Sequence, residues 1–250
     1  MVEILGIPLF DKSISDAVQI ILDNSDPQKL HNFCVSATGA HGLIHSKKNL
    51  KFKEILSSFY INLPDGMPSV WVGRYKGSHT MERCYGPDFF EMAMNRSNGK
   101  IKHFLCGGKG DVAKKLEKVC VHDFKANVVG TYSPPFVSIE QYNYKQIGQM
   151  INKSGANVVW IGLSTPKQEE FAYNLAKHTH VNFVCCVGAA FDFHIGNVRQ
   201  APYWVQSIGM EWFFRLIVEP KRLWRRYFEI VPLFIYYNFA ELIKKGFDKK

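Results

Sequence analysis

One carboxylate, that of Asp65, is a candidate reactive group. It follows a short, mostly apolar run over residues 61–63 and lies between Pro64 and Gly66. Pro64 fixes its own φ and biases the preceding residue toward an extended backbone, whereas Gly66 permits a sharp turn. We therefore expect Asp65 at the end of a strand, where α/β proteins keep their reactive groups. The alternative is that Asp65 only caps the following helix, a common role of aspartate.

A second candidate region is a strand-to-helix turn that suits a phosphate. An apolar run ends in Gly162, and Thr165 is the expected N-cap of the helix after it. Pro166 suits the first helical position, and Gln168 completes a Thr-x-x-Gln capping box. Free amide groups and the positive end of the helix dipole favour a phosphate there, and Lys167 adds charge.

Small and polar side chains follow two other apolar runs. Residues 30–35 predict a strand that leads to Ser36 and Thr38, whose hydroxyls can either bond a ligand or cap a helix. Residues 181–187 predict another strand, after which Asp192 can accept a hydrogen bond from a base or a sugar. All these positions fall beyond predicted strands, where α/β proteins bind ligands.

Other patterns give no independent site. The glycine turn at residues 107–111 resembles a phosphate cradle in outline but matches neither the P-loop nor the dinucleotide pattern. His41 and His45 lie four residues apart without a third ligand, so we predict a surface pair and no metal site. The six cysteines form no Cys-x-x-Cys pair and lie in apolar contexts, which indicates buried residues in a reducing compartment. The chain also lacks an Asp-x-Asp metal-binding pair.

The charge of the chain indicates an anionic partner. Lys and Arg exceed Asp and Glu by 31 to 22, a formal net charge of +9. Residues 199–250 carry ten Lys or Arg against five Asp or Glu, so this last part of the chain holds +5 of the excess. A nucleic acid, a phosphorylated small molecule or an acidic lipid surface would each fit. With 46% hydrophobic residues in 250, the chain can bury a full core.

The carboxy-terminal segment has its own pattern. Apolar residues recur every four positions from Trp204 to Leu216, and the stripe continues beyond a break at Pro220. Arginines are interleaved with this stripe at Arg215, Arg222, Arg225 and Arg226. They either form the solvated face of a core-packing helix or belong to a segment that lies on an anionic membrane and turns some of them toward a diphosphate.

The alternation of strand-like and helix-like segments predicts an α/β fold. We expect a mainly parallel, Rossmann-like sheet with helices on both faces over residues 1–198, and a helical, membrane-associating appendage over residues 199–250. The amino terminus has too short an apolar run for a signal peptide, and no run reaches the ~18 apolar residues of a spanning helix. The protein is therefore expected in the cytosol or on a membrane surface.

Three local features are also predicted. The mostly apolar segment of residues 2–7 indicates one short strand. Asp88 is the expected N-cap of the helix that follows it, with Glu91 three residues later. Ser138 and Gln141 form the capping box of one helix that runs to about residue 153.

Taken together, these segments resemble the WecG/TagA/CpsF family of bacterial glycosyltransferases over nearly the whole chain. The matching motifs are Pro-Asp-Gly at residues 64–66 and the runs at 82–88, 162–169, 191–192, 211–215 and 219–222. Several independent matches in the right order are far less expected by chance than a single one.

The resemblance implies an inverting transfer of a sugar from a UDP-sugar to a polyprenyl diphosphate-linked acceptor, in bacterial surface polysaccharide synthesis. The sugar would be an N-acetylhexosamine such as N-acetylmannosamine, or a related hexose or uronic acid. The resemblance also implies a core that needs no cofactor or divalent metal, and a peripheral location on the inner face of the cell membrane, where the appendage completes the active site.

Particular residues take roles from this resemblance. Asp65 matches the general base, and three appendage arginines match those that reach the diphosphate: Arg215, Arg222 and Arg225. Ser36 and Thr38 fall where the family usually has a Thr and an Asn in the sugar pocket. The implied substrate-binding set is Ser36, Thr38, Arg83, Gly162, Thr165, Pro166, Lys167, Gln168, Glu169, Phe191 and Asp192. The family's Arg-Ala-Pro appears here with Gln200 in the first place and Arg199 one position early.

Inverting transfer needs one base for the attacking hydroxyl and one cation for the departing UDP.

Two other interpretations stay open at this point. A Rossmann oxidoreductase fits the alternation but lacks the Gly-x-Gly-x-x-Gly fingerprint. A non-catalytic module that binds acidic lipid or nucleic acid through the basic tail leaves Asp65 and the Thr165 turn without a role. We expect no nucleic-acid partner and allow a homo-oligomer formed through the core.

Overall fold

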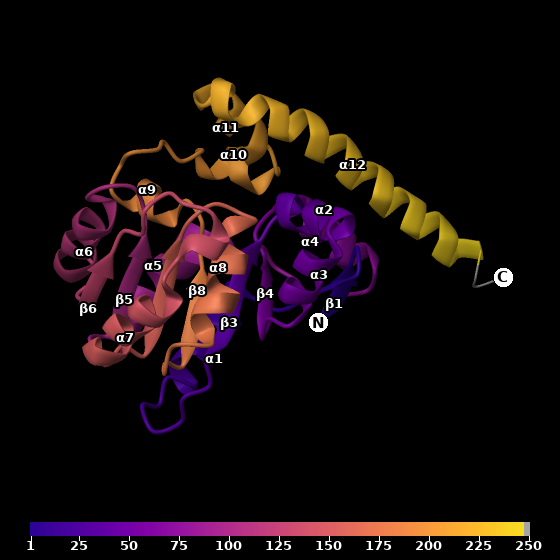
Figure 1. The fold of residues 1–250 in the computed structure, drawn as a ribbon. Helices are drawn as coiled ribbons and strands as arrows, with labels where there is room; N and C mark the ends of the chain where they lie inside the picture. Colours follow the sequence, from indigo (N-terminus) through magenta and orange to yellow (C-terminus); the bar gives the residue numbers. More distant parts are fainter. Residues whose placement is uncertain (248–250) are drawn as a thin grey trace.

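The core of the protein is a sheet of six parallel strands (Figure 1). The computed structural model describes residues 1–247; residues 248–250 of the expected appendage lie outside it. The strand order is β4-β3-β8-β7-β5-β6, and every pairing within the sheet is parallel. The strands are β3 (Phe33–Thr38), β4 (Ile61–Pro64), β5 (Lys102–Gly107), β6 (Asn127–Tyr132), β7 (Val158–Gly162) and β8 (Phe183–Cys186). The predicted parallel sheet is confirmed, and all six strands end at the same edge.

Helices cover both faces of this sheet. Val159 and Ile161 belong to one buried cluster, and Val158 and Trp160 to another, because successive strand residues point to opposite faces. The first face is covered by α2 (Ala40–Lys48), α3 (Leu50–Ser57), α7 (Tyr144–Ser154) and α8 (Lys167–Ala176). The second face is covered by α1 (Ile14–Asp23), α5 (Gly86–Ser97), α6 (Val112–His122) and α9 (Ala190–His194). All six cysteines are free and buried, as predicted.

The amino terminus differs from the prediction. The single strand expected over residues 2–7 is instead an antiparallel hairpin of β1 (Val2–Ile4) and β2 (Ile7–Leu9). Leu5 and Gly6 form its turn with φ values of 54° and 83°, so the chain reverses in the middle of the segment that was expected to be one strand. The hairpin packs on α4 (Met67–Tyr75).

Two predicted helix starts are also wrong. α5 begins at Gly86 with Tyr85 as its N-cap, so Asp88 lies within the first turn. A proline is tolerated in a first turn, and Pro87 allows this earlier start. The capping box of Ser138 is present, but it closes only a short 3₁₀ helix, η1 (Ile139–Gln141). α7 begins separately, with Asn143 as its N-cap.

Three helices follow the core: α10 (Tyr203–Ser207), α11 (Glu211–Val218) and α12 (Pro220–Phe247). Pro220 opens α12, at the predicted break. In Figure 1, α12 lies across α2 and extends past the sheet. Ile230 and Phe234 of α12 are buried in the same cluster as residues of α2. Among residues 1–247, no helix is both long and apolar enough to cross a membrane. The division between residues 198 and 199 stays a prediction.

Candidate active site

The edge where the parallel strands end brings the predicted polar segments together. Thr38 at the end of β3 is in register with Pro64 at the end of β4, and the Asp65 amide donates to the Thr38 carbonyl at 3.3 Å. β8 lies next to β3 in the sheet and β7 lies next to β8, all in parallel, so the segments that follow them, with Asp192 and Thr165, lie at this same edge. The predicted position of Asp65 at a strand end is confirmed.

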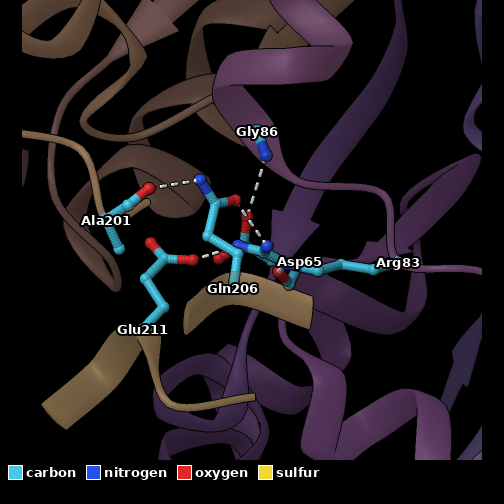
Figure 2. Close-up of polar contacts among 6 residues, drawn as sticks. All are labelled: Asp65, Arg83, Gly86, Ala201, Gln206 and Glu211. Carbon is cyan, nitrogen blue, oxygen red and sulfur yellow. Dashed lines mark hydrogen bonds and ion pairs between the residues drawn. The ribbon is translucent and has the colours of Figure 1, made fainter. Parts of the chain in front are cut away.

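The Asp65 carboxylate receives a backbone hydrogen bond from a helix start. The Gly86 amide, in the first turn of α5, donates to Asp65 Oδ1 at 2.9 Å (Figure 2). The helix directly after Asp65, α4, has Gly66 as its N-cap and no side-chain cap, so Asp65 does not cap that helix. A Cβ placed at Gly39 would lie 3.5 Å from Asp65 Oδ2, which leaves a glycine-sized gap on that side. The carboxylate is half-buried.

These surroundings make Asp65 a better base than an ordinary aspartate. Its pKa is raised from 3.8 to about 6, mainly by burial and in smaller part by the negative charge of Glu211. Arg83, the Gly86 amide and Arg215 act in the opposite direction. A carboxylate with a pKa near 6 is still mostly ionised at neutral pH and binds a proton more strongly.

Arg83 connects the Asp65 segment to the carboxy-terminal helices (Figure 2). Its Nε donates to the Asp65 carbonyl at 2.9 Å, and its Nη1 donates to Gln206 Oε1 at 2.8 Å. Its Nη2 forms an ion pair with Glu211 at the start of α11. Gln206 in turn donates to the Ala201 carbonyl at 2.8 Å. The Arg83 guanidinium is thus held by protein groups, and it fixes the appendage beside Asp65.

Four of the predicted residues form one buried cluster. Glu169 Oε1 accepts from Ser36 Oγ at 3.0 Å, from Thr165 Oγ1 at 2.9 Å and from Gln168 Nε2 at 2.9 Å. Gln168 Oε1 accepts from the Gly188 amide at 3.0 Å. The cluster therefore ties together the ends of β3, β7 and β8. Burial raises the pKa of Glu169 from 4.5 to about 7, and its Oε2 has no hydrogen-bond partner within the described part of the chain.

The start of α8 differs from the prediction. Thr165 is not the N-cap: Pro166 occupies that position after a cis peptide bond, and α8 begins at Lys167. The Thr165 hydroxyl instead accepts from the Gln168 side chain at 3.2 Å. Ser36 and Thr38 do not cap a helix either, because β3 extends over both residues.

Lys167 points away from the start of α8. Its Nζ donates to the Val137 carbonyl and lies 4.3 Å from the ring centre of Phe136. Thr38, which is buried, bonds Asn62 Oδ1 at 3.4 Å. These two side chains are engaged by neighbouring protein groups.

Phe191 and Asp192 follow β8 at the same edge. Phe191 is buried and packs directly on Gly162, where a Cβ would lie 2.6 Å from the ring, so this position requires glycine. Asp192 is half-buried, and its Oδ1 accepts from Asn197 Nδ2 at 3.1 Å. Beyond this loop, a hollow of about 600 Å³ lies against Val218 and Glu219 at the end of α11.

One of the three predicted arginines, Arg215, lies close enough to Asp65 for their charges to interact. Arg215 is largely buried, and its Nε has no hydrogen-bond partner among the described residues. Burial lowers its pKa, but Tyr227 and Tyr85, followed by Glu211 and Asp65, outweigh that effect and raise it. The position therefore holds a permanent positive charge beside the candidate base.

The other two predicted arginines lie on the exposed side of α12. Arg222 pairs with Glu219 at 2.8 Å, and Arg225 lies over the ring of Trp224. Arg199 is exposed and lines the 600 Å³ hollow. The contacts of Arg222 and Arg225 do not reach the Asp65 segment.

Two residues near the site were not predicted. Gln206 bonds Arg83, and no motif pointed to it. Arg226 is half-buried and lies close to Arg215 and Arg222. A signal for Arg226 exists in the sequence, because it falls three residues after the buried Leu223 and four before the buried Ile230, on the packed stripe of α12.

Comparison with known proteins shows the family of this chain. The family model described as "Glycosyl transferase WecG/TagA/CpsF family" matches residues 2–247. A Bacillus subtilis (strain 168) protein named N-acetylglucosaminyldiphosphoundecaprenol N-acetyl-beta-D-mannosaminyltransferase is 28% identical over 98% of this chain and 94% of its own length. A Bacillus spizizenii protein of the same name is 29% identical over 79% of this chain and 75% of its own length. The chain thus belongs to the WecG/TagA/CpsF family of glycosyltransferases.

Proposed function

We propose that this glycosyltransferase moves N-acetylmannosamine from a UDP-linked donor to a polyprenyl diphosphate-linked N-acetylglucosamine, with inversion at the anomeric carbon. The names of the two Bacillus relatives support the sugar and the lipid-linked acceptor. The observation that carries the proposal is that Asp65, a half-buried carboxylate with a raised pKa, and the largely buried guanidinium of Arg215 lie close enough for their charges to act on each other.

In the proposed reaction, Asp65 takes the proton from the attacking acceptor hydroxyl. The hydroxyl oxygen forms a bond to the anomeric carbon on the face opposite UDP, the bond to the UDP oxygen breaks, and the electron pair leaves with UDP. Such a base is worth ~10²–10⁴-fold in rate. Arg215 would neutralise the charge that develops on the diphosphate, a contact worth ~10²–10³-fold. Because the sequence lacks an Asp-x-Asp pair, we assign this neutralisation to arginine.

The surface of the appendage supports a membrane-bound acceptor. Large apolar side chains of α10, α11 and α12 are exposed, and they include Tyr203 at 84%, Phe228 at 74% and Tyr236 at 65%. Exposed aromatic residues interleaved with cationic ones suit an anionic lipid surface. We therefore place the protein on the inner face of the cell membrane, with the appendage against the lipid.

The test is a donor panel with a fixed acceptor. The full-length protein is given UDP-N-acetylmannosamine, UDP-N-acetylglucosamine, UDP-glucose or a UDP-uronic acid, together with a short-chain lipid diphosphate that carries N-acetylglucosamine. UDP release and the mass of the lipid product are measured. The expected result is acceptor-dependent UDP release with UDP-N-acetylmannosamine and a product larger by one N-acetylhexosamine. UDP release with another donor but not with UDP-N-acetylmannosamine would refute the assigned sugar. Absence of UDP release with all four donors would refute the proposed acceptor.

A further inference from the structure

A hollow lies between α2 and α12, separate from the Asp65–Arg83 contacts. Its volume is about 300 Å³, and its polar lining comes from His41, His45 and Lys48 on α2 and from Arg226 and Glu229 on α12. α2 begins directly after Gly39, the residue that borders Asp65 Oδ2. The hollow therefore adjoins the candidate active site along the first turn of α2.

The positive charge in this hollow is not balanced. The carboxylate in the lining, that of Glu229, pairs with Lys48 at 2.5 Å. Arg226 lies over the ring of Tyr227, and its Nε is buried without a hydrogen-bond partner within residues 1–247. Burial lowers the pKa of Arg226, and the positive charges of Arg215 and Arg222 lower it further. Arg226 is half-buried, no carboxylate is paired with it among the ion pairs of the described residues, and an anion in the hollow would offset the cost of holding its charge next to like charges.

His41 supplies a second donor at the same place. Burial lowers its pKa to about 4, and the positive charge of Arg226 contributes to this shift. The imidazole is therefore neutral near pH 7 and carries one N–H that can donate. The influence of Arg226 on His41 also indicates that the two side chains lie close together.

We propose that this hollow binds a phosphate-class anion, with the Arg226 guanidinium and the His41 imidazole as its principal donors. Arginine matches phosphate oxygens with two parallel N–H groups, and its charge-assisted bonds are about twice as strong as neutral ones. The site is distinct from Arg222 and Arg225, whose side chains point to the exposed side of α12.

The position of the hollow suggests how its ligand relates to the reaction. His41 lies two residues after Gly39, so a molecule along this turn of α2 can reach both the anion site and Asp65. A lipid-linked acceptor could place its diphosphate in the anion site and its sugar hydroxyl near Asp65. This identification of the anion rests on the proposed function. Free phosphate and a phospholipid headgroup have the same chemistry, and the experiment separates these sources.

The first measurement is calorimetric titration of the full-length protein with inorganic pyrophosphate, without donor or acceptor. Arg226→Gln should weaken binding by about tenfold or more, because a hydrogen bond to a charged group is worth ~1.5–3 kcal/mol. Lys221→Gln is the matched control: it removes one positive charge from the exposed surface of the same helix, and we expect a change of less than about twofold. Equal affinity of wild type and Arg226→Gln, or equal losses in both variants, would overturn the proposal.

A second variant guards against a folding defect in Arg226→Gln. His41→Phe keeps a ring in the lining but removes both nitrogens, and we expect it to weaken pyrophosphate binding by about threefold to tenfold. Its control is Lys47→Gln, an exposed change on the same helix. Far-UV circular dichroism verifies the fold of every variant. Unchanged binding by a folded His41→Phe protein would remove His41 from the site and contradict the proposal as stated.

The third measurement identifies the source of the anion. If it is the acceptor diphosphate, Arg226→Gln raises the KM for the short-chain acceptor and leaves the KM for the donor unchanged. If it is a headgroup, phosphatidylglycerol vesicles compete with pyrophosphate and the acceptor KM does not move. If it is free phosphate, neither change occurs and orthophosphate competes with pyrophosphate. Pyrophosphate binding is read without sugar transfer, so loss of this proposal leaves the donor-panel result intact, and the reverse also holds.

Discussion

Two carboxylates at the same sheet edge, Asp65 after β4 and Glu169 in α8, have similar proton affinities but different surroundings. Burial raises the pKa of Asp65 to about 6 and that of Glu169 to about 7. Asp65 accepts one backbone hydrogen bond and lies beside Arg83 and the appendage. Glu169 is fully buried and accepts from Ser36, Thr165 and Gln168 through one oxygen.

The difference shows why a raised pKa alone does not identify a base. Glu169 Oε1 accepts hydrogen bonds from three protein donors, and these bonds hold the ends of β3, β7 and β8 together. Asp65 has an open side toward Gly39, and both positive groups, Arg83 and Arg215, and a negative group, Glu211, act on it. Glu169 Oε2 accepts no hydrogen bond from the described residues but is buried, so only Asp65 offers an oxygen that a bound molecule can reach. We therefore expect the two carboxylates to respond differently to the same kind of substitution.

The largest expected difference is in turnover. Asp65→Asn removes the base while its amide oxygen can still accept from Gly86, so kcat should fall ~10²–10⁴-fold. Glu169→Gln keeps an accepting oxygen for its three donors, and kcat should fall no more than about tenfold, since one neutral hydrogen bond contributes ~1 kcal/mol. Rates of UDP release by the two purified variants test this. Similar losses in both would mean that Glu169 also takes part in the chemistry.

The strand ends could be predicted from the sequence, whereas the contacts between them could not. Asp65 depends on its neighbours Pro64 and Gly66, so local geometry was sufficient to place it. The bond between Ser36 and Glu169 spans 133 positions and depends on how β3 and β8 pair. No local pattern encodes such a contact.

The same distinction explains the appendage. The break at Pro220 is a local property of the backbone and was predicted correctly. The ion pair of Arg83 with Glu211 joins residues 128 positions apart. The sequence does not distinguish Arg226 from the other interleaved arginines, because the residues that surround it come from α2, a helix early in the chain.

A smaller effect is expected on stability. The folded protein binds a proton at Asp65 more tightly than the unfolded chain does, so the free energy of unfolding falls as the pH rises from about 4 to about 6. At 1.36 kcal/mol per unit, this ionisation costs at most about 3 kcal/mol above pH 6. Asp65→Asn should therefore melt at a higher temperature than wild type at pH 8, and at a similar temperature at pH 4.

Glu169→Gln sharpens this comparison. It also removes a costly ionisation, now between about pH 4.5 and about pH 7. However, the new amide nitrogen takes the place of Oε2, which is buried without a partner in the described structure, and a buried unsatisfied donor costs ~1–3 kcal/mol. Thermal melts at pH 8 should show a smaller gain than for Asp65→Asn. An equal or larger gain would mean that the site around Glu169 is open to water.

The smallest expected effect is on the pH dependence of kcat/KM, which links Asp65 to the appendage. In the wild type, kcat/KM should rise with pH through about 6, as Asp65 loses its proton, and then level off. Glu211 raises the pKa of Asp65, so Glu211→Gln should move this rise to lower pH, by less than the whole displacement from 3.8 to about 6. Glu54→Gln, an exposed change on α3, removes the same charge at a residue that is not among those shifting the pKa of Asp65, and it should leave the profile in place. Because a purely structural defect lowers kcat/KM at every pH without displacing the curve, an unmoved profile in Glu211→Gln would show that the appendage does not set the proton affinity of the base.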